Sequence, residues 1–283
     1  MILVTGAAGK TGQAVLRAIQ KRNVALRALV RNQEQAESLL KYGISDAVIG
    51  DLTSLECLKE AMNGINSVYH ICPNMHPAEE EIGRLMISAA RENNVEKFVF
   101  HSVLHPQTEK MPHHWQKLRV EEALFESGLD FVILQPAPYM QNILAFKDVV
   151  INEGVYRIPY PPQARTSLLD LGDLGQAAST VLTDPGHSNA VYEIVGTGPL
   201  TQEEIAGSIG RHLNRVVKVE EAPLDQWRLQ AKELDMDTYQ LETLSSMFEY
   251  YANYGLTGNS NVLQMLLGRS PNSLDDFVRR EFV

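Results

Sequence analysis

Three glycines, Gly6, Gly9 and Gly12, recur at intervals of three residues in the segment VTGAAGKTG, which overlaps the apolar segment MILVT. The next segment, KTGQAVLRAIQKR, has the apolar spacing of an amphipathic helix. A glycine-rich turn between a buried strand and a helix is typical of dinucleotide sites. The first glycine permits the tight turn, the second lets the backbone approach a pyrophosphate, and the third lets the helix pack closely on the strand. The segment therefore predicts dinucleotide binding at the N-terminus of that helix.

Apolar and amphipathic segments continue to alternate up to about residue 138. Further strands are predicted at ALRALV, DAVIG, SVYHI, KFVFHS and DFVILQP, and helices at NQEQAESLLKYG, at SLECLKEAMNG, within residues 77–93 and over residues 115–127. Such alternation implies right-handed crossovers and a parallel sheet covered by helices on both faces. The expected fold class is α/β, with a Rossmann-type doubly wound parallel sheet.

The second half of the chain is less regular. AVYEIVG predicts a seventh strand, and residues 238–283 are predicted to be mostly helical. We expect a nucleotide-binding domain over residues 1–150, with return segments near 166–196, and a smaller, largely helical C-terminal substrate cap over residues 151–283. Aromatic residues of this cap either cover a substrate or pack its core: Trp227, Phe248, Tyr250, Tyr251 and Tyr254.

Composition narrows the class of protein. The net charge is -10 and there is no run of Lys or Arg, which argues against a nucleic-acid partner. The two cysteines, Cys57 and Cys72, have no C-x-x-C neighbour, as expected in a reducing cytoplasmic compartment. No signal peptide or membrane span is expected, and the eight histidines show no metal-ligand spacing. A small-molecule partner fits these properties, and both monomer and homodimer remain open.

The residue after the second predicted strand indicates whether a dinucleotide site prefers NAD or NADP. An acidic residue there would bind the adenosine ribose hydroxyls, whereas this chain has Arg31 in the segment LVRN. Arginine pairs with phosphate in a bidentate manner, so NADP(H) is favoured. Arg31 as a solvated surface residue is the alternative, and Lys10 in the glycine loop either adds to the phosphate field or faces solvent.

The ends of the later strands carry further candidate residues. Asp51 and Leu52 are expected at the adenine edge, although Asp51 can also cap a helix that begins at Thr53. Ile71, Cys72 and Pro73 would form a wall beside the ribose and nicotinamide, with Cys72 as a packing residue rather than a nucleophile. Ser102 either contacts a substrate carbonyl or the nicotinamide amide, or bonds locally at its strand end.

These segments together resemble a known family. GAAGKTG, LVRN, GDL, FHSVLHP, KLRVEEALFESGLDFVILQPAPYMQN, DLGDLGQAA and LLGRSPNSLDDFV are similar to the NmrA-like branch of the atypical short-chain dehydrogenases/reductases, over nearly the whole chain. That family includes NADPH-dependent reductases of quinones, triphenylmethane dyes and plant phenolics. It also includes regulators that bind NAD(P) without reducing anything.

The resemblance implies roles for individual residues. Gly6, Gly9, Thr11, Gly12 and Arg31 would hold the adenosine pyrophosphate. Lys117 would reach the nicotinamide ribose, and residues from Pro136 to Tyr139 would line the nicotinamide pocket. Structural roles are implied for Glu121, Asn142 and Asp173.

The superfamily's Tyr-x-x-x-Lys motif is altered here to HHWQK, with His113 in place of the tyrosine and Lys117 retained. Lys117 can orient the ribose and add positive potential near developing oxyanion charge. His113 either replaces the tyrosine as an acid or lies exposed at a helix start. We expect an NADPH-dependent reductase that transfers hydride to a small conjugated acceptor of the quinone, dye, imine or enone type. The alternative is a non-catalytic NADP(H)-sensing regulatory protein that binds a protein partner.

Overall fold

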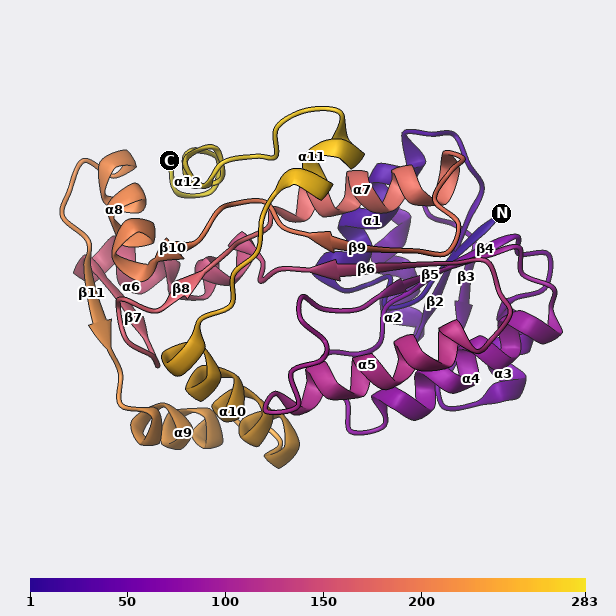
Figure 1. Cartoon of the computed structure of the whole chain (residues 1–283), viewed down its shortest axis with the longest axis horizontal. Coiled ribbons are helices and arrows are strands. Elements are labelled where there is room, and N and C mark those ends of the chain that lie inside the picture. The colour runs from indigo at the N-terminus through magenta and orange to yellow at the C-terminus, as the bar shows by residue number, and fades with distance from the viewer. The chain divides into compact units, whose positions relative to one another are not determined.

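Seven short apolar segments form the central sheet of the computed structural model, which describes all residues from Met1 to Val283 (Figure 1). The strands are β1 (Ile2–Val4), β2 (Leu26–Val30), β3 (Ala47–Ile49), β4 (Ser67–His70), β5 (Lys97–His101), β6 (Phe131–Pro136) and β9 (Ala190–Ile194). Their order is β3-β2-β1-β4-β5-β6-β9, and the pairings from β3 to β6 are all parallel. The doubly wound α/β fold predicted from the alternation is confirmed.

Helices cover both faces of this sheet. They are α1 (Lys10–Gln20), α2 (Gln33–Leu40), α3 (Leu55–Ala61), α4 (Glu79–Glu92), α5 (Pro112–Phe125) and α7 (Leu171–Thr183). Figure 1 shows α1 and α7 on one face and α3, α4 and α5 on the other. Two close helix contacts depend on glycine. A Cβ atom on Gly175 would lie 2.5 Å from the carbonyl oxygen of Ala14, and one on Gly83 would lie 2.4 Å from a methyl carbon of Val120.

The chain forms two units. Unit 1 comprises Met1–Gln107, His113–Gln135 and Leu174–Tyr192, and unit 2 comprises Thr108–Pro112, Pro136–Asp173 and Glu193–Val283. The first unit thus takes in the glycine loop and most of the strands and helices described so far. Residues 136–150 lie in unit 2 in this division, whereas we had placed them in the first domain from the sequence.

Unit 2 contains short strands and most of the later helices. These are η1 (Met140–Phe146), α6 (Lys147–Glu153), β7 (Val155–Ile158), β8 (Arg165–Thr166), β10 (Leu200–Thr201), α8 (Gln202–His212), β11 (Lys218–Glu221), α9 (Leu224–Glu233), α10 (Thr238–Tyr254), α11 (Asn261–Leu267) and α12 (Leu274–Phe282). β10 pairs antiparallel with β8, and β11 pairs parallel with β7. The core of the unit includes Ile205, Ile209 and Phe277. None of the helices has both the length and the apolar character needed to span a membrane.

Asp173 anchors the first turn of α7. Its buried carboxylate accepts hydrogen bonds from the Arg269 guanidinium at 2.7 Å and from the Asn272 backbone N–H at 2.6 Å. These contacts within unit 2 hold the segment before α12 against the start of α7. They agree with the structural role that the family resemblance implied for this residue.

Candidate cofactor site

The glycine loop leaves little room for a side chain at two of its three glycine positions. Gly6 has φ +59°, and a Cβ atom there would lie 3.0 Å from Cβ of Ile71. A Cβ atom on Gly12 would lie 2.3 Å from the carbonyl oxygen of Gly6, so α1 rests directly on the loop. Gly9 donates its N–H to the same carbonyl oxygen at 3.1 Å. The loop is thus a tight backbone turn in contact with the end of β4.

The N-terminus of α1 is open to a ligand. Gly9 is its N-cap residue and no side chain caps it, so N–H groups of the first turn have no protein acceptor at that end. Lys10 is exposed and Thr11 is half-buried beside it. Free N–H groups and the helix dipole favour an anion. The residues present therefore fit the pyrophosphate of a dinucleotide, and the contacts of individual residues with it stay predictions.

Thr5 joins the glycine loop to the end of β4. Its hydroxyl donates to the carbonyl oxygen of Ile71 at 3.0 Å, and the Ile71 N–H donates to the same hydroxyl at 2.9 Å. The third partner is Nδ1 of His70, also at 2.9 Å. Sequence reasoning did not identify Thr5, because a threonine at a strand end has no pattern that distinguishes it from an ordinary buried residue.

Arg31 directly follows β2 and is exposed. Its backbone N–H donates to the side chain of Gln35 at 3.0 Å, while the Asn32 side chain caps α2 by accepting the Gln35 N–H at 2.9 Å. The guanidinium forms no ion pair and no hydrogen bond within the chain. It is therefore available to a phosphate group.

The structure after β3 rules out one of the two roles considered for Asp51, the capping of a helix that begins at Thr53. Its carboxylate accepts the Thr53 N–H at 2.9 Å, and this hydrogen bond lowers the pKa of Asp51. The helix does not begin at Thr53, however: α3 begins at Leu55, and Ser54 is its N-cap. The prediction that Asp51 caps a helix from Thr53 was wrong, because the serine hydroxyl takes the capping position. Leu52 packs against the core of unit 1.

The chain leaves β4 through the three residues expected to form a wall. Ile71 and Pro73 are half-buried, and Cys72 is buried. Burial raises the pKa of the Cys72 thiol, with a smaller contribution in the same direction from the negative charge of Glu79. The thiol is therefore held in its protonated form, in agreement with a packing role for Cys72.

Lys117 on α5 forms an ion pair with Glu79, the first residue of α4. The Glu79 side chain is 1% exposed and that of Lys117 is 14% exposed. The Lys117 Nζ also lies 5.7 Å from the centre of the Phe100 ring. Glu79 was missed from sequence because it opens the acidic run EEE at residues 79–81, which is typical of a solvated first turn.

Ser102 lies in a second buried hydrogen-bond network at the end of β5. Its hydroxyl donates to the carboxylate of Glu121, and the Gln135 side chain donates to both oxygens of that carboxylate at 3.0 Å. Burial raises the pKa of Glu121, while the bonds from Ser102 and Gln135 lower it. Because the serine proton is committed to Glu121, Ser102 can accept a further hydrogen bond but has no second proton to donate.

Four histidines of unit 1 are buried: His70, His101, His113 and His114. Burial is the main cause that lowers the pKa of each, to about 3 for His70 and His101 and to about 4 for His114, and well below the ordinary value for His113. The positive charge of Lys117 contributes in every case. His113 is thus not exposed at the helix start, and its Nδ1 has no hydrogen-bond partner.

Pro136 and Tyr139, expected beside the nicotinamide, lie in unit 2. Pro136 is buried at the end of β6, and Tyr139 is half-buried and forms a parallel bridge with Leu169. The adjacent Ala137 N–H donates to the carbonyl oxygen of Ile194 at 2.9 Å. This backbone bonding fixes the course of the segment after β6.

The aromatic residues of the C-terminal part contact one another within unit 2. The rings of Trp227 and Phe248 are 4.8 Å apart, and the Tyr160 ring lies 5.8 Å from both Phe248 and Tyr251. Tyr254 is exposed. Mutual packing therefore accounts for several of these rings, as the alternative interpretation of the sequence predicted.

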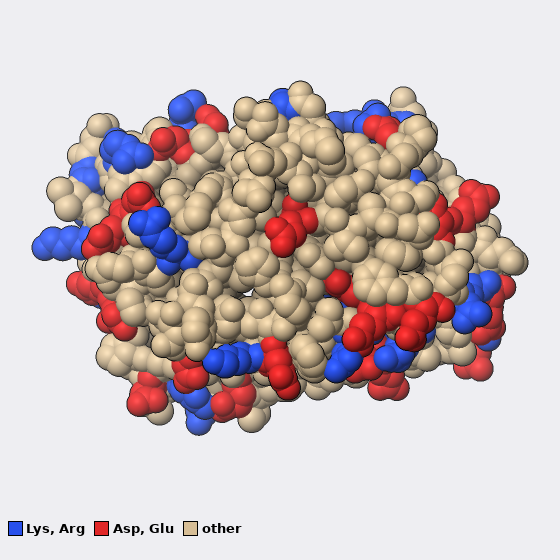
Figure 2. Space-filling view, viewed as in Figure 1, with Lys and Arg blue, Asp and Glu red and all other residues tan.

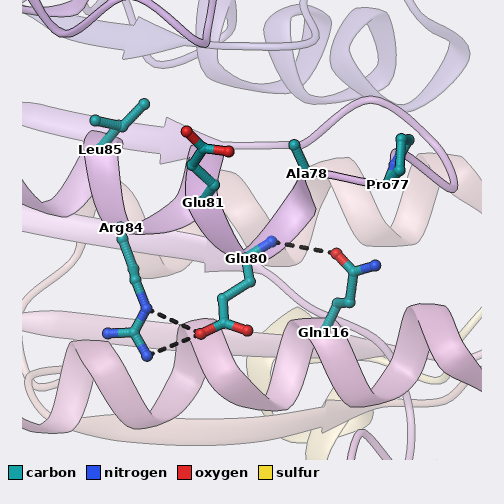
Figure 3. A pocket seen from close by; sticks show the side chains of 7 residues that line it. All are labelled: Pro77, Ala78, Glu80, Glu81, Arg84, Leu85 and Gln116. Atoms are coloured by element: carbon teal, nitrogen blue, oxygen red, sulfur yellow. Dashed lines mark hydrogen bonds and ion pairs between the residues drawn. The ribbon is translucent and has the colours of Figure 1, made fainter.

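A surface groove of about 790 Å³ lies along α4 and α5 (Figure 3), and none of its lining residues belongs to the glycine loop. It is lined by Pro77, Ala78, Glu80, Glu81, Arg84, Leu85 and Gln116. The Arg84 guanidinium pairs with Glu80 at 3.0 Å, and the Glu80 N–H donates to the Gln116 side chain at 3.3 Å. Its charged groups are largely paired, so we assign it no ligand. On the face shown in Figure 2, acidic and basic residues are interspersed without an extended basic patch.

Comparison with known proteins decides the family. The model of the NmrA-like family matches residues 1–278. The chain belongs to the NmrA-like family. The resemblance noted in the glycine loop and in the lysine helix is thereby confirmed over almost the entire length of the chain.

Relatives of this NmrA-like chain include named oxidoreductases. NAD(P)H azoreductase of Xenophilus azovorans is 25% identical over 281 residues, which is 99% of this chain and 97% of the relative. Quinone oxidoreductase 2 of Escherichia coli (strain K12) is 24% identical and covers 100% of this chain and 99% of the relative.

Solved structures share the fold of this NmrA-like chain. The NADPH complex of the Escherichia coli NADPH-dependent quinone oxidoreductase has a TM-score of 0.88 at 24% identity, and the NADP(H) complex of Citrobacter sp. triphenylmethane reductase has 0.85 at 22% identity. Both cover 100% of each chain. The negative transcriptional regulator NmrA in complex with NAD has 0.83 at 14% identity, over 99% of this chain and 94% of that one.

Proposed function

We propose that this protein is an NADPH-dependent reductase that transfers hydride to a small conjugated acceptor of the quinone, dye, imine or enone type. The observation that carries the proposal is the largely buried ammonium of Lys117, which lies in the same unit as the glycine loop and 5.7 Å from the centre of the Phe100 ring on β5. The names of the relatives support it, since they include an azoreductase and a quinone oxidoreductase.

NADPH is the proposed cofactor. The unpaired guanidinium of Arg31 follows β2, where an acid would favour NAD, and the uncapped N-terminus of α1 suits a pyrophosphate. Two structural relatives carry NADPH or NADP(H) in their complexes. The contacts proposed within unit 1 are those of Gly6, Gly9, Lys10, Thr11, Gly12, Arg31, Asp51, Leu52, Ile71, Cys72, Pro73 and Lys117, and those proposed from unit 2 are Pro136 and Tyr139.

The chemistry of the bound cofactor would be hydride donation. Lys117 would hydrogen-bond the ribose hydroxyls and stabilise negative charge that develops on the acceptor. Ser102 would accept a hydrogen bond from an amide N–H, because its own proton is directed at Glu121. None of the four buried histidines has a pKa suited to proton donation near neutral pH, so the reduced product would take its proton from water.

The state of those histidines also gives the strongest support for the alternative, a non-catalytic NADP(H)-sensing regulator that binds a protein partner. A site without a side-chain acid of suitable pKa can bind a cofactor and reduce nothing. The two functions differ in one measurable property, the consumption of NADPH.

The test is NADPH oxidation in the presence of a panel of quinones, triphenylmethane dyes, imines and enones, with NADH in parallel. Turnover of at least one acceptor, lost in a folded Gly9→Val variant, supports the reductase. NADPH binding without turnover of any acceptor would favour the regulator.

Two further properties belong to the proposal. We place the protein in the cytoplasm, where the free thiols of Cys57 and Cys72 would stay reduced. We also propose that unit 1 binds the cofactor and that unit 2 serves as the substrate cap, in a monomer or a homodimer. Size-exclusion chromatography with light scattering decides the oligomeric state.

A further inference from the structure

The packing of α4 on α5 explains why Glu79 faces Lys117. Gly83 lies four residues after Glu79, and Val120 lies three residues after Lys117, so each pair shares one face of its helix. A Cβ atom on Gly83 would collide with Val120 at 2.4 Å, which shows how closely the helices approach there. One turn before this contact, the same approach brings the carboxylate of Glu79 to the ammonium of Lys117.

Burial makes this ion pair a fixed contact. The Glu79 side chain is 1% exposed, and its pKa is raised by burial and lowered by the charge and the hydrogen bond of Lys117. A buried carboxylate without a partner is costly, and breaking such a pair leaves an uncompensated charge. Glu79 also lies in the first turn of α4, where the helix dipole favours a negative charge.

Lys117 has a long, flexible stem that does not fix its own position. Two contacts define where its ammonium lies: the hydrogen-bonded ion pair with Glu79, and the Phe100 ring, whose centre is 5.7 Å from Nζ. The ion pair is the shorter of the two and involves a full negative charge. Without it, the ammonium could turn toward solvent and away from the ends of β4 and β5.

We propose that Glu79 is a positioning residue for hydride transfer, because its buried carboxylate holds the Lys117 ammonium where the ribose and the developing oxyanion would meet it. The inference rests on the proposed function, in which Lys117 acts on the cofactor. Glu79 itself touches neither cofactor nor substrate in this proposal, and it acts through Lys117 alone.

The test is a double-mutant cycle between Glu79→Gln and Lys117→Met, with Glu80→Gln as the matched control. Glu80 is the next residue, is partly exposed and pairs with Arg84, so its replacement removes a carboxylate without touching Lys117. Glu79→Gln should lower kcat by about tenfold to a hundredfold, the effect of a displaced catalytic group, and should weaken NADPH affinity less than it lowers kcat. Glu80→Gln should stay within about twofold of the parent, as expected for an exposed surface pair.

The double variant decides whether Glu79 acts through Lys117. Glu79→Gln in the Lys117→Met background should lower kcat no further, because the group to be positioned is gone. Parental turnover in Glu79→Gln, or decreases that multiply in the double variant, would overturn the inference. Thermal melts and circular dichroism establish that each variant is folded. If Glu79→Gln does not fold, Glu79→Asp, which keeps the negative charge and shortens the side chain by one methylene group, takes its place and should lower kcat in the parent but not in the Lys117→Met background.

The readouts separate this inference from the proposed function. If the parent oxidises NADPH with an acceptor and the effects of the two substitutions are additive, the positioning role of Glu79 is refuted. The proposed reductase function is then unaffected. A parent that binds NADPH but reduces no acceptor refutes the reductase, and the same cycle is then measured as NADPH dissociation constants. Non-additive changes there support positioning by Glu79, and additive changes refute it.

Discussion

The carbonyl oxygen of Gly6 lies 2.3 Å from the point at which a Cβ atom on Gly12 would stand. Two backbone atoms of Ala7 would also lie within 3 Å of that Cβ. A methyl group at position 12 would therefore meet rigid backbone rather than a side chain that can rotate away. The close approach of α1 to the loop depends on the missing side chain.

Gly12→Ala should accordingly destabilise the fold. We expect the free energy of unfolding to fall by about 1–3 kcal/mol, the range for overpacking a tight contact. Urea denaturation followed by circular dichroism measures it. Gly198→Ala is the matched control, because a Cβ atom there has no neighbour within 4 Å, and its stability should match the parent's. Equal stability of all three proteins would show that the loop adapts easily.

Gly9→Val should separate binding from folding. Gly9 has φ -75° and ψ 164°, which any L-residue can adopt, and a Cβ atom there would approach only the Gly6 carbonyl oxygen, at 3.3 Å. A branched side chain would instead occupy the space that a pyrophosphate needs. The variant should melt near the parent and lose NADPH binding in a fluorescence titration. Normal NADPH binding by Gly9→Val would place the cofactor elsewhere.

Arg31→Ala should reduce the preference for NADPH. The parent should bind NADPH more tightly than NADH, and the variant should lose about 1–3 kcal/mol of that difference, the scale of a charge-assisted hydrogen bond. Isothermal titration with both cofactors measures it. Arg91→Ala, which removes an exposed arginine from the last turn of α4, controls for net charge. Equal affinity of the parent for both cofactors refutes the assignment.

Lys117 and His113 should differ in their importance for turnover. Lys117→Met should lower kcat by around a hundredfold and weaken cofactor binding, because a nicotinamide ring that is no longer held in position transfers hydride more slowly. His113→Ala should stay within several-fold of the parent, and the pH profile should show no step near ~6.5, because burial lowers the pKa of His113 well below that value. If Lys117→Met stays active and His113→Ala is folded but inactive, His113 is the proton donor and this prediction is wrong.

Acidification should destabilise the protein through its buried histidines. Their pKa values are lower in the folded than in the unfolded chain, so the unfolded chain binds more protons below the ordinary histidine value. Between pH ~6.5 and ~5.5 each should cost about 1 kcal/mol of unfolding free energy, or about 4 kcal/mol for the four. The raised pKa values of Glu79 and Glu121 act in the opposite direction.

Urea denaturation at several pH values tests this dependence. His113→Leu is the informative variant, because His113 Nδ1 has no partner to lose. It should remove roughly a quarter of the histidine contribution, since one of four equivalent protonation sites is gone. A His113→Leu variant whose unfolding free energy depends on pH as steeply as the parent's between pH ~7.5 and ~5.5 would contradict the neutral, buried state of this ring.

The strands and helices of the central sheet were predictable because their apolar periodicity is local. The six apolar segments from MILVT to DFVILQP each show it, and each contains a strand of the folded protein. The two-stranded pairs β8–β10 and β7–β11 were harder, because strands of two to four residues are defined by their partners rather than by their own sequence. The helix at SLECLKEAMNG was predictable, but Asp51 and Ser54 are both good capping residues, and only the structure shows that Ser54 takes the N-cap position.

The parts of the candidate site that depend on backbone geometry were predictable from the sequence. The parts that depend on contacts between side chains of different helices were not. Three regularly spaced glycines predict a loop. Nothing in EEE at residues 79–81 indicates that the first carboxylate alone turns inward, because that is decided by the approach of Val120 to Gly83. The burial of His113 likewise depends on how α5 packs in the folded chain, which the local sequence HHWQK does not show.

The Thr5 hydroxyl uses its single proton and both lone pairs, on Ile71 and His70. Few amino acids could replace it. Valine has the same shape and no hydroxyl, and serine has the hydroxyl without the methyl group that fills the core. In a library with every amino acid at position 5, selection for folded protein should therefore retain threonine, with serine as its nearest substitute. The range of residues tolerated at position 5 would in this way report how firmly β1 and β4 are joined beside the candidate cofactor site.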